Sequence, residues 1–387
     1  MDLHYSKKQI AFREEVRSWL QENVPKAGLK SFDTAEGFEQ HRKWEQQLAK
    51  GNWGMVTWPV EYGGRGCDLI EWLIFEEEYY RARAPLRVNQ NGIFLLGPTL
   101  MEYGTDEQKL RFITGMAQGH EMWAQAWSEP GAGSDMAAIR TEARLDGDDY
   151  IINGQKIWST RAVYADWAFC LIRTEPDSSR HHGLSFVLVP LSADGITVRP
   201  IKQLNGLPGF AEIFFDEVRV SQNNRVGEPG QGWKIAMATA GFERGLMLRS
   251  PARFQEAARR LLELYRKKRH DIIDLSIEDS VVRCYLDAEA YALSTYQTAS
   301  RLAAGGSIGP EASCNKIFWS ELDLRIHKTA LNLLGAGAEL IAGDETPQEV
   351  GSWLDGFMFA QSGPIYAGTN EIQRNIIAER VLGMPRK

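Results

Sequence analysis

The middle of the chain follows a different hydrophobic repeat from its two ends, and this change limits the folds that the chain can adopt. Between residues 124 and 226, short β-rich runs such as Tyr150-Ile151-Ile152 are separated by polar turns such as Asp146-Gly147-Asp148. No helical segments alternate with these runs, which disfavours a parallel, doubly wound sheet. The spacing instead predicts a β-barrel or sandwich of roughly a hundred residues.

The residues before this stretch have the spacing of helices. Apolar side chains recur at helical intervals behind Ser6, and Gln9 is placed to complete a capping box with that serine. Thr105 and Gln108 predict a second helix start of the same kind. Residues 58–66, which contain proline and several glycines, predict a loop between the two.

After Gly232 the helical repeat returns and continues to the end of the chain. Long periodic segments are interrupted by glycine clusters, as at Gly305-Gly306 and Gly335-Ala336-Gly337. Several long helices with short breaks predict an antiparallel bundle. The long segments are residues 253–268, 281–304 and 311–334.

The chain has 387 residues, 43% of them hydrophobic, which is enough for a large core and two or three domains. We therefore predict a mainly α protein with a central β-barrel domain. The expected domains are an N-terminal helical domain over residues 1–123, a β-barrel over 124–230, and a C-terminal bundle over 231–387.

The net charge of −7 disfavours a general attraction to nucleic acid or to an anionic membrane. The basic block at residues 266–269 is short and typical of a solvated helix end. The N-terminus lacks the apolar core of a signal peptide, and no apolar run is long enough to span a membrane. We expect a cytoplasmic protein with neither a nucleic-acid nor a membrane partner.

The cysteines are far apart in the sequence and form no Cys-x-x-Cys pair. They fit reduced thiols in a cytosolic protein better than a disulfide framework or a zinc site. The pair His181-His182 lies in a polar stretch that fits a solvated loop, so no metal site is expected. The cysteines are Cys67, Cys170, Cys284 and Cys314.

Residues 127–135, Trp-Ser-Glu-Pro-Gly-Ala-Gly-Ser-Asp, lie at the boundary between the helical and β-rich regions. Small residues allow a ligand to approach the backbone closely, and turns of this kind can present several amides to an anion. A tight interdomain turn accounts for the same residues equally well. The segment is not a dinucleotide fingerprint, because Met136 stands where the third glycine would be.

Residues 153–160, Asn-Gly-Gln-Lys-Ile-Trp-Ser-Thr, predict a hairpin turn at Asn153-Gly154 followed by a strand. Because side chains alternate along a strand, Trp158 and Thr160 would then lie on one face. An aromatic ring and a hydroxyl on one face could flank a planar cofactor, although a buried tryptophan more often fills a core.

Residues 365–374, Ile-Tyr-Ala-Gly-Thr-Asn-Glu-Ile-Gln-Arg, predict a helix start with Thr369 as N-cap and Glu371 in the first turn. Such an N-terminus can hold a phosphate. An ordinary capped helix explains Glu371 equally well.

Read together, these segments resemble the acyl-CoA dehydrogenase family. WPVEYGG at residues 58–64, EPGAGSD, NGQKIWST, the stretch FFDEVRV…VGEPGQGW and YAGTNEIQR occur in the family's order over nearly the whole chain. The pairing of EPGAGSD with NGQKIW at this spacing is a specific signal. The resemblance implies a helical domain, a β-barrel and a four-helix bundle, which agrees with the organisation predicted above.

The resemblance also implies a ligand site. In this family FAD lies between the β-domain and the C-terminal bundle, so FAD is the expected cofactor and an acyl-CoA the expected substrate. Ser134 would contact the CoA arm, and the backbone amide of Ala367 would polarise the thioester carbonyl. The residues implied at FAD are Trp127, Ser128, Trp158 and Thr160 at the flavin ring, and Thr369 and Glu371 near the phosphates.

The implied reaction removes the α-proton to a carboxylate while the β-hydride passes to the flavin, giving a 2,3-enoyl-CoA. Many family members carry this base in a Tyr-Glu-Gly-Thr motif, where this chain has Ala367, and alanine cannot accept a proton. Other members place the base before an arginine on the first bundle helix. Glu243 is therefore the predicted catalytic base, and Arg244 a possible substrate contact; a surface charge pair on a helix is the alternative, which the alanine at position 367 disfavours.

Other departures bear on partners and substrate. The family's Arg-x-x-Phe-Gly motif, which touches FAD across a dimer interface, is not evident near residues 267–274, and Glu371 replaces a usual glutamine. These features resemble a bacterial subgroup that includes dicarboxyl-CoA and sterol side-chain dehydrogenases, some of which pair two unlike subunits. Gly241 and Gly245 flank the predicted base and could leave room for a wide acyl group.

The expected partners are an electron-transfer flavoprotein and either further copies of the chain or a related subunit in a heterotetramer. Two alternatives remain. One is a non-catalytic or half-site subunit of a heteromeric acyl-CoA dehydrogenase, which would retain FAD weakly when isolated. The other is a flavin oxidase or monooxygenase on the same fold, which would be reoxidised rapidly by oxygen.

Overall fold

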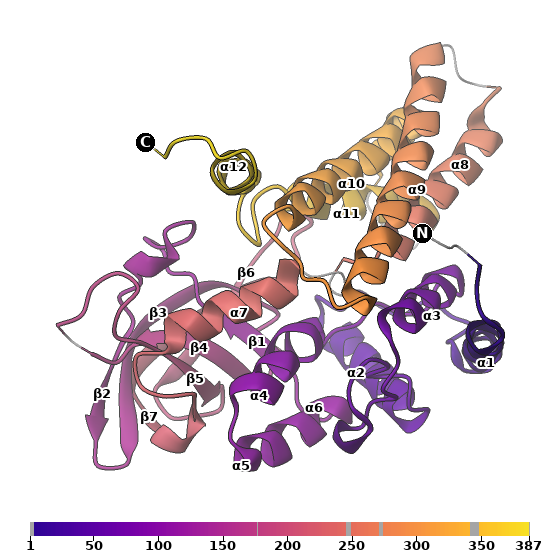
Figure 1. Cartoon of the computed structure of the whole chain (residues 1–387). Coiled ribbons are helices and arrows are strands. Elements are labelled where there is room, and N and C mark those ends of the chain that lie inside the picture. Colours follow the sequence, from indigo (N-terminus) through magenta and orange to yellow (C-terminus); the bar gives the residue numbers. More distant parts are fainter. Residues whose placement is uncertain (1–3, 176, 245–248, 271–273, 341–347, 387) are drawn as a thin grey trace. The chain divides into compact units, whose positions relative to one another are not determined.

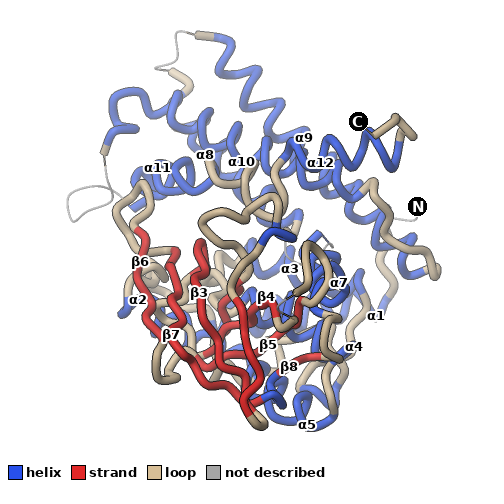
Figure 2. Tube along the Cα trace, turned by 90° about the vertical axis from the view of Figure 1, so that its left-hand side faces the viewer, coloured by secondary structure: helices blue, strands red, loops and turns tan. Residues whose placement is uncertain are grey.

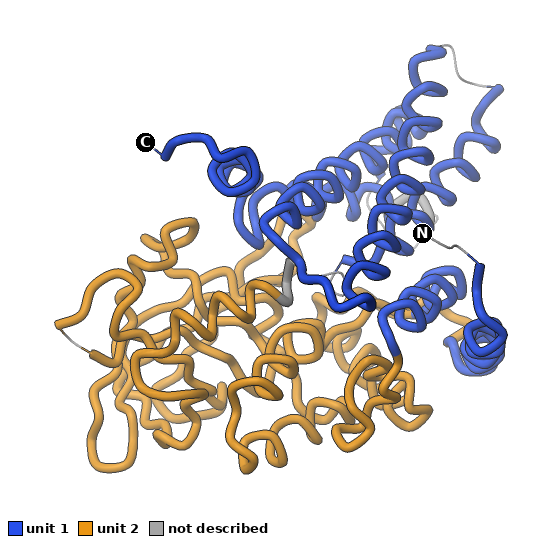
Figure 3. Tube along the Cα trace, in the orientation of Figure 1, with its two compact units in different colours: residues 1–24, 68–84, 244–387 blue, residues 25–67, 85–243 orange. Residues whose placement is uncertain are grey.

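The structure is a computed structural model that describes residues 4–175, 177–244, 249–270, 274–340 and 348–386 (Figure 1). The chain forms two compact units, each built from separate stretches of sequence (Figure 3). The first unit comprises Met1–Val24, Asp68–Ala84 and Arg244–Lys387. The second comprises Pro25–Cys67 and Pro85–Glu243.

The N-terminal third is helical, as predicted. Both capping boxes are present: the amide of Gln9 donates to Ser6 Oγ (3.2 Å), and the amide of Gln108 donates to Thr105 Oγ1 (3.2 Å). Each box satisfies an amide that the first helical turn leaves without a partner. The helices are α1 (Lys7–Asn23), α2 (Ala35–Lys50), α3 (Leu69–Arg81), α4 (Gly97–Tyr103), α5 (Asp106–Gln108) and α6 (Thr114–Ala117).

The central region is an eight-stranded sheet in which seven strands follow the order β6-β7-β3-β2-β4-β5-β8 and β1, the eighth, pairs with β4 (Figure 2). Most neighbouring strands are antiparallel, so the prediction against a doubly wound parallel sheet is confirmed. The strands are β1 (Trp123–Ala126), β2 (Glu142–Asp146), β3 (Asp149–Thr160), β4 (Trp167–Arg173), β5 (Leu184–Pro190), β6 (Ile196–Ile201), β7 (Phe210–Ser221) and β8 (Arg225–Val226).

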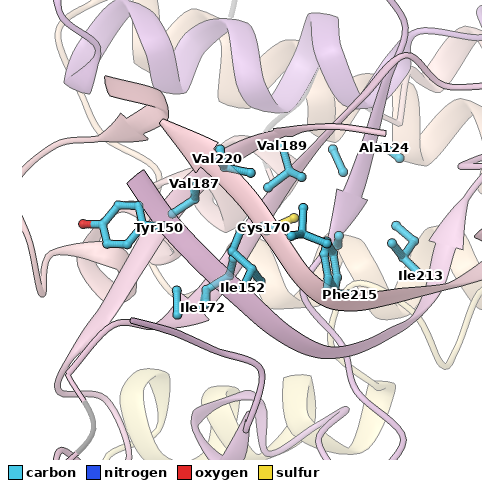
Figure 4. Close-up of a cluster of buried hydrophobic side chains, with 14 of the residues drawn as sticks. Ala124, Tyr150, Ile152, Cys170, Ile172, Val187, Val189, Ile213, Phe215 and Val220 are labelled. Atoms are coloured by element: carbon cyan, nitrogen blue, oxygen red, sulfur yellow. The ribbon is translucent and has the colours of Figure 1, made fainter. Parts of the chain in front are cut away.

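The interior of the sheet region is filled by short aliphatic and aromatic side chains (Figure 4). Ile152 on β3, Val187 on β5 and Ile213 on β7 are fully buried around Cys170 on β4. Burial raises the pKa of the Cys170 thiol to about 12, against the opposing pull of a nearby ammonium, so this cysteine stays protonated.

The predicted hairpin at Asn153-Gly154 is wrong, because β3 continues through both residues and the β2–β3 turn lies at Gly147. Asn153 instead serves a β-bulge, in which Glu217 of β7 has a left-handed φ of 50° and its amide donates to Asn153 Oδ1 (2.9 Å). Gly154 is needed because a Cβ there would meet Thr141 at 2.7 Å. Tertiary contacts therefore override the local turn preference of Asn-Gly.

The C-terminal part of the first unit is a bundle whose helices share one core. Phe254 stacks on Trp319 with ring centroids 6.2 Å apart, and Leu261, Leu322 and Ile326 are fully buried beside them. The predicted bundle and the overall fold class are thus confirmed. The helices of this part are α8 (Pro251–Lys268), α9 (Leu275–Ala303), α10 (Ala312–Leu334), α11 (Gln348–Ala360) and α12 (Asn370–Ile376). The preceding helix, α7 (Gly232–Arg244), lies in the second unit as far as Glu243. Among the described residues, no helix is long and apolar enough to cross a membrane.

Candidate functional site

The segment that follows β1 begins with a buried tryptophan. The Trp127 ring meets Phe169 and Phe186 edge-on, at centroid distances of 6.0 and 6.2 Å. Its indole Nε1 is buried without a hydrogen-bond partner. A buried donor of this kind is costly unless something satisfies it, so it is a place to look for a ligand acceptor.

A tight turn follows, closed by two backbone hydrogen bonds between Glu129 and Ala132 (3.1 and 3.0 Å). A Cβ built at Gly131 or Gly133 would meet nothing within 4 Å, so both glycines face open space. Ser134 is exposed beside them. The small residues of this segment therefore leave the backbone open to close approach, as the sequence predicted.

Trp158 has an unusual backbone and an exposed ring. Its φ of 61° lies in the left-handed region, which costs a non-glycine residue about 1 kcal/mol, and 58% of its surface is exposed. It sits in a β-bulge, since two residues of β3, Ile157 and Trp158, oppose the single residue Glu212 of β7. The bulge turns the indole away from the core. The exposed indole meets the ring of Phe210 edge-on, with the ring centroids 6.2 Å apart.

This bulge changes the reasoning about the two faces of β3. The extra residue breaks strict alternation between Lys156 and Ser159, which stand on either side of the bulge, and the placement of Trp158 and Thr160 on one face stays a prediction. Lys156 and Ser159 are the fully buried pair, whereas Thr160 is half-buried. The Ser159 hydroxyl has no hydrogen-bond partner.

A buried ion pair lies beneath these two segments. The Lys156 ammonium donates to Glu129 Oε1 (2.8 Å), and the carboxylate also accepts from the amides of Arg140 (2.6 Å) and Thr141 (2.9 Å). Burial opposes the ionisation of Glu129, but the ammonium and the amide donors outweigh it and lower the pKa of the carboxyl. Sequence reasoning missed this pair, although both residues belong to the motifs EPGAGSD and NGQKIW.

In the first unit, the turn at Ala367-Gly368 has left-handed φ values of 57° and 77°. Buried Gln373 holds it, because its Nε2 donates to the carbonyls of Ala367 (3.4 Å) and Gly368 (3.3 Å). Thr369 caps α12 as predicted, accepting from the amide of Ile372 (3.2 Å).

Glu371 occupies the first turn of α12, also as predicted, with its side chain largely exposed and paired with Arg374 at 3.3 Å. Its role near a phosphate stays a prediction.

The same turn is anchored from α10 by a buried lysine that sequence reasoning also missed. Lys316 Nζ donates to the carbonyl of Gly363 (2.8 Å) and to Asn370 Oδ1 (2.8 Å). Tyr366, next to the turn, packs against Trp319 at a centroid distance of 6.0 Å. The backbone at Ala367 is therefore held on both sides.

The predicted base is on the last turn of α7, where the backbone of Glu243 and Arg244 is helical. Their side chains lie outside the described residues. Gly241, two residues before Glu243, is exposed and faces open space.

The predicted residues belong to both units, and within each unit the structure brings several together. In the second unit, the amide of Ile157 donates to the carbonyl of Ser128 (2.9 Å), which joins the Trp127-Ser128 segment to the Trp158 bulge. In the first unit, Ala367, Thr369 and Glu371 share one turn and helix start. Over the described ranges, no three histidine, cysteine or carboxylate side chains are grouped to hold a metal ion.

Models of all three acyl-CoA dehydrogenase domains match the chain: the N-terminal domain over residues 6–120, the middle domain over 124–218 and the C-terminal domain over 230–382. The chain therefore belongs to the acyl-CoA dehydrogenase family. Members of this family are flavoproteins that oxidise CH–CH bonds.

Particular relatives agree over the full length. The chain is 40% identical to acyl-CoA dehydrogenase IpdE1 of Mycobacterium tuberculosis, with 97% of this chain and 98% of that protein covered. Its fold matches the Tcur3481-Tcur3483 steroid ACAD with a TM-score of 0.88 and 27% identity, over 100% of both chains. It matches the ChsE4-ChsE5 complex from Mycobacterium tuberculosis with a TM-score of 0.83 and 32% identity, also over 100% of both chains.

Proposed function

We propose that this protein is an FAD-dependent acyl-CoA dehydrogenase that converts an acyl-CoA thioester to the 2,3-enoyl-CoA. The observation that carries the proposal is the pair of segments in the second unit. The amide of Ile157, next to the exposed indole of Trp158, donates to the carbonyl of Ser128, and an open glycine turn follows at residues 131–133. FAD, when bound, supplies the acceptor for the substrate's β-hydride.

The residues of this chain fit a flavin. Trp158 offers an aromatic face that the bulge holds out of the core. Trp127 Nε1 and Ser159 Oγ are buried polar groups without a hydrogen-bond partner, which a ligand could provide. Trp127, Ser128, Trp158 and Thr160 would hold the ring system, and Thr369 and Glu371 would lie near the phosphates. Ser134 would contact the CoA arm.

The chain's own part in the chemistry is to acidify and remove the α-proton. The amide of Ala367 would donate to the thioester oxygen. A fixed donor aimed at a developing oxyanion lowers the activation free energy by about 3 kcal/mol. The left-handed turn and its bonds from Gln373 make that amide rigid. Because alanine has no proton acceptor, Glu243 takes the proton, and Arg244 contacts substrate.

A carboxylate beside an apolar acyl chain loses hydration, and its pKa rises towards the pH at which it works as a base. This is the role we assign to Glu243. Gly241 faces open space two residues earlier, and one of the matched structures is named a steroid ACAD. We therefore propose a bulky, sterol-derived acyl group as the substrate class.

The enzyme is proposed to act in the cytoplasm, with an electron-transfer flavoprotein as its oxidant, and to assemble with further copies or with a related subunit. Two of the matched structures are named for pairs of proteins. In addition, α9 exposes Val282, Leu286 and Leu293 at spacings that place them on one helix face. An exposed apolar stripe of this kind marks a contact surface more often than a free one.

The test is an anaerobic titration of FAD-loaded protein with acyl-CoAs that run from short straight chains through dicarboxylic acids to sterol side chains, followed by flavin absorbance. Bleaching by the sterol class supports the proposal, and bleaching by short chains alone removes the substrate class. Firmly bound FAD that no thioester bleaches contradicts the dehydrogenase assignment.

A second candidate is a half-site subunit of a heteromeric dehydrogenase, favoured by the alanine at position 367 and by the relatives' paired names. An isolated chain that fails to retain FAD, but retains it after mixing with a related subunit, would select this candidate. Rapid reoxidation of the reduced flavin by oxygen would instead select an oxidase or monooxygenase.

A further inference from the structure

Among the residues of the second unit whose burial the structure describes, Lys156 is the most completely enclosed charged side chain, with no exposed surface. Its ammonium has three protons, and each has an acceptor: the carbonyl of Trp127 (3.1 Å), Glu129 Oε1 (2.8 Å) and the carbonyl of Leu171 (2.7 Å). The three acceptors lie on the segment after β1 and on β4, while the lysine itself is on β3. One ammonium therefore ties three separate stretches of chain together.

Glu129 extends the network. Its two oxygens also accept from the amides of Arg140 and Thr141, which lead into β2. Its backbone closes the turn at residues 129–132. The carboxylate thus fixes the start and the orientation of the open glycine turn.

The network lies between the two segments to which we assign the flavin ring. Lys156 is two residues before Trp158, at the start of the bulge. Its ammonium holds the carbonyl of Trp127, and the next amide, of Ile157, holds the carbonyl of Ser128 (2.9 Å). The spacing between Trp127-Ser128 and Trp158 is therefore set by one side-chain bond and one backbone bond.

We propose that Lys156 and Glu129 are a positioning pair that sets the separation of the Trp127-Ser128 and Trp158 walls for a flavin. The inference rests on the proposed function for the cofactor. Neither residue needs to touch the flavin, because each acts through the backbone that it holds. A buried charge pair is an expensive device for stability alone, since apolar residues of similar volume often serve as well. The Lys156 ammonium, however, forms three directed hydrogen bonds that fix the backbone, and apolar side chains cannot form such bonds.

The second unit also contains a matched control. Arg87 Nε donates to Glu45 Oε2 (2.7 Å), and both side chains are buried. This pair holds the carbonyl of Gly54 and the amide of Val88, and both of these residues lie outside the two proposed flavin walls. Removal of either cation, Lys156 or Arg87, leaves a buried carboxylate without its partner. The two substitutions therefore differ mainly in which backbone segment loses its hydrogen bonds.

The experiment compares Lys156→Met with Arg87→Met in the full chain. FAD affinity is measured by quenching of flavin fluorescence on titration into apo-protein, and folding by far-UV circular dichroism and thermal unfolding. A cofactor-independent readout is the acrylamide quenching of Trp158, taken as the difference between each protein and its Trp158→Phe partner.

We expect both variants to lose similar thermal stability, but Lys156→Met to weaken FAD binding by roughly ten-fold or more, as loss of a supporting shell does, while Arg87→Met changes it little. The Trp158 quenching constant should change in Lys156→Met alone. Equal effects of both variants on FAD and on Trp158 would overturn the inference and leave only a structural pair.

If Lys156→Met does not fold, Glu129→Gln against Glu45→Gln makes the same comparison. If the unaltered protein binds no FAD, the proposal that this chain is an FAD-dependent dehydrogenase is contradicted. The Trp158 quenching result still decides the positioning role in that case, because it needs no ligand.

Discussion

Asp323→Asn should loosen the helical bundle by an amount that the geometry of its ion pair sets. Asp323 lies on α10 with 3% of its side chain exposed, and its Oδ2 is 2.9 Å from Arg253 Nη2 on α8. His327 Nδ1 lies 3.3 Å from the other carboxylate oxygen. The substitution keeps the shape of the side chain and removes its charge.

Loss of one partner from a fully buried ion pair costs about 3–5 kcal/mol. Arg253 keeps 28% of its side chain exposed, so water recovers part of this loss, and we expect about 2–3 kcal/mol. The control is Asp279→Asn on α9, whose partner Arg283 is 2.7 Å away but whose side chains are 69% and 61% exposed for arginine and aspartate. That change should cost less than about 0.5 kcal/mol.

The assay is hydrogen exchange of the α10 backbone amides, which reports the free energy of opening of that helix. The expected loss corresponds to exchange that is roughly 30- to 150-fold faster in Asp323→Asn. Unchanged protection of the α10 amides, or an equal change in Asp279→Asn, would refute the reasoning. Burial would then not determine how much the Asp323–Arg253 pair contributes to stability.

The pH dependence gives an independent check. Burial opposes ionisation of Asp323, but Arg253 outweighs it, so the pKa of the folded carboxyl lies below its ordinary value of about 3.9. The contribution of the charge is therefore complete above that value and is lost as the pH falls through the folded pKa. The difference in stability between the parent protein and Asp323→Asn should therefore narrow below about pH 4.

Three further outcomes are expected. Glu243→Gln should retain FAD and lose turnover by roughly 10²–10⁴-fold, the usual worth of a general base, and near-normal turnover would exclude Glu243 as the base. Gly154→Ala should destabilise the sheet by about 2 kcal/mol in urea unfolding, because its φ is 143° and its Cβ would meet Thr141; an unchanged midpoint would contradict this. In the native protein at pH 8, a thiol reagent should modify exposed Cys314 and leave Cys170 intact, since burial raises the pKa of Cys170 to about 12; rapid loss of both thiols would contradict it.

Much of the fold could be predicted from local sequence because the signals and their causes lie close together. The capping boxes at Ser6 and Thr105 need only residues three positions apart, and the β-rich runs need only period-two patterning. The hairpin at Asn153-Gly154 failed because the decisive partner, Glu217, lies 64 residues away. The local turn preference of Asn-Gly does not reveal that the side-chain amide of Asn153 bonds to a distant strand.

The candidate site divides in the same way. Thr369 as an N-cap followed from its own helix, and the structure confirms it. Lys156 gave no local sign of being buried, because its acceptors Glu129 and Leu171 lie 27 and 15 residues away. The left-handed turn at Trp158 likewise depends on how β3 meets β7. A residue's chemistry is readable in sequence, whereas its enclosure depends on partners that only the fold brings together.

The discontinuous first unit has a consequence for synthesis on the ribosome. α3 packs against α8 and α9, and Tyr296 on α9 donates to Glu77 on α3 (2.6 Å). More than 160 residues separate the end of α3 from the start of the last stretch of that unit. At typical elongation rates, the nascent chain waits on the order of ten seconds or more before α3 can pack against α8 and α9. Translation speed and chaperone supply should therefore limit the yield of this protein more than the folding of its sheet does.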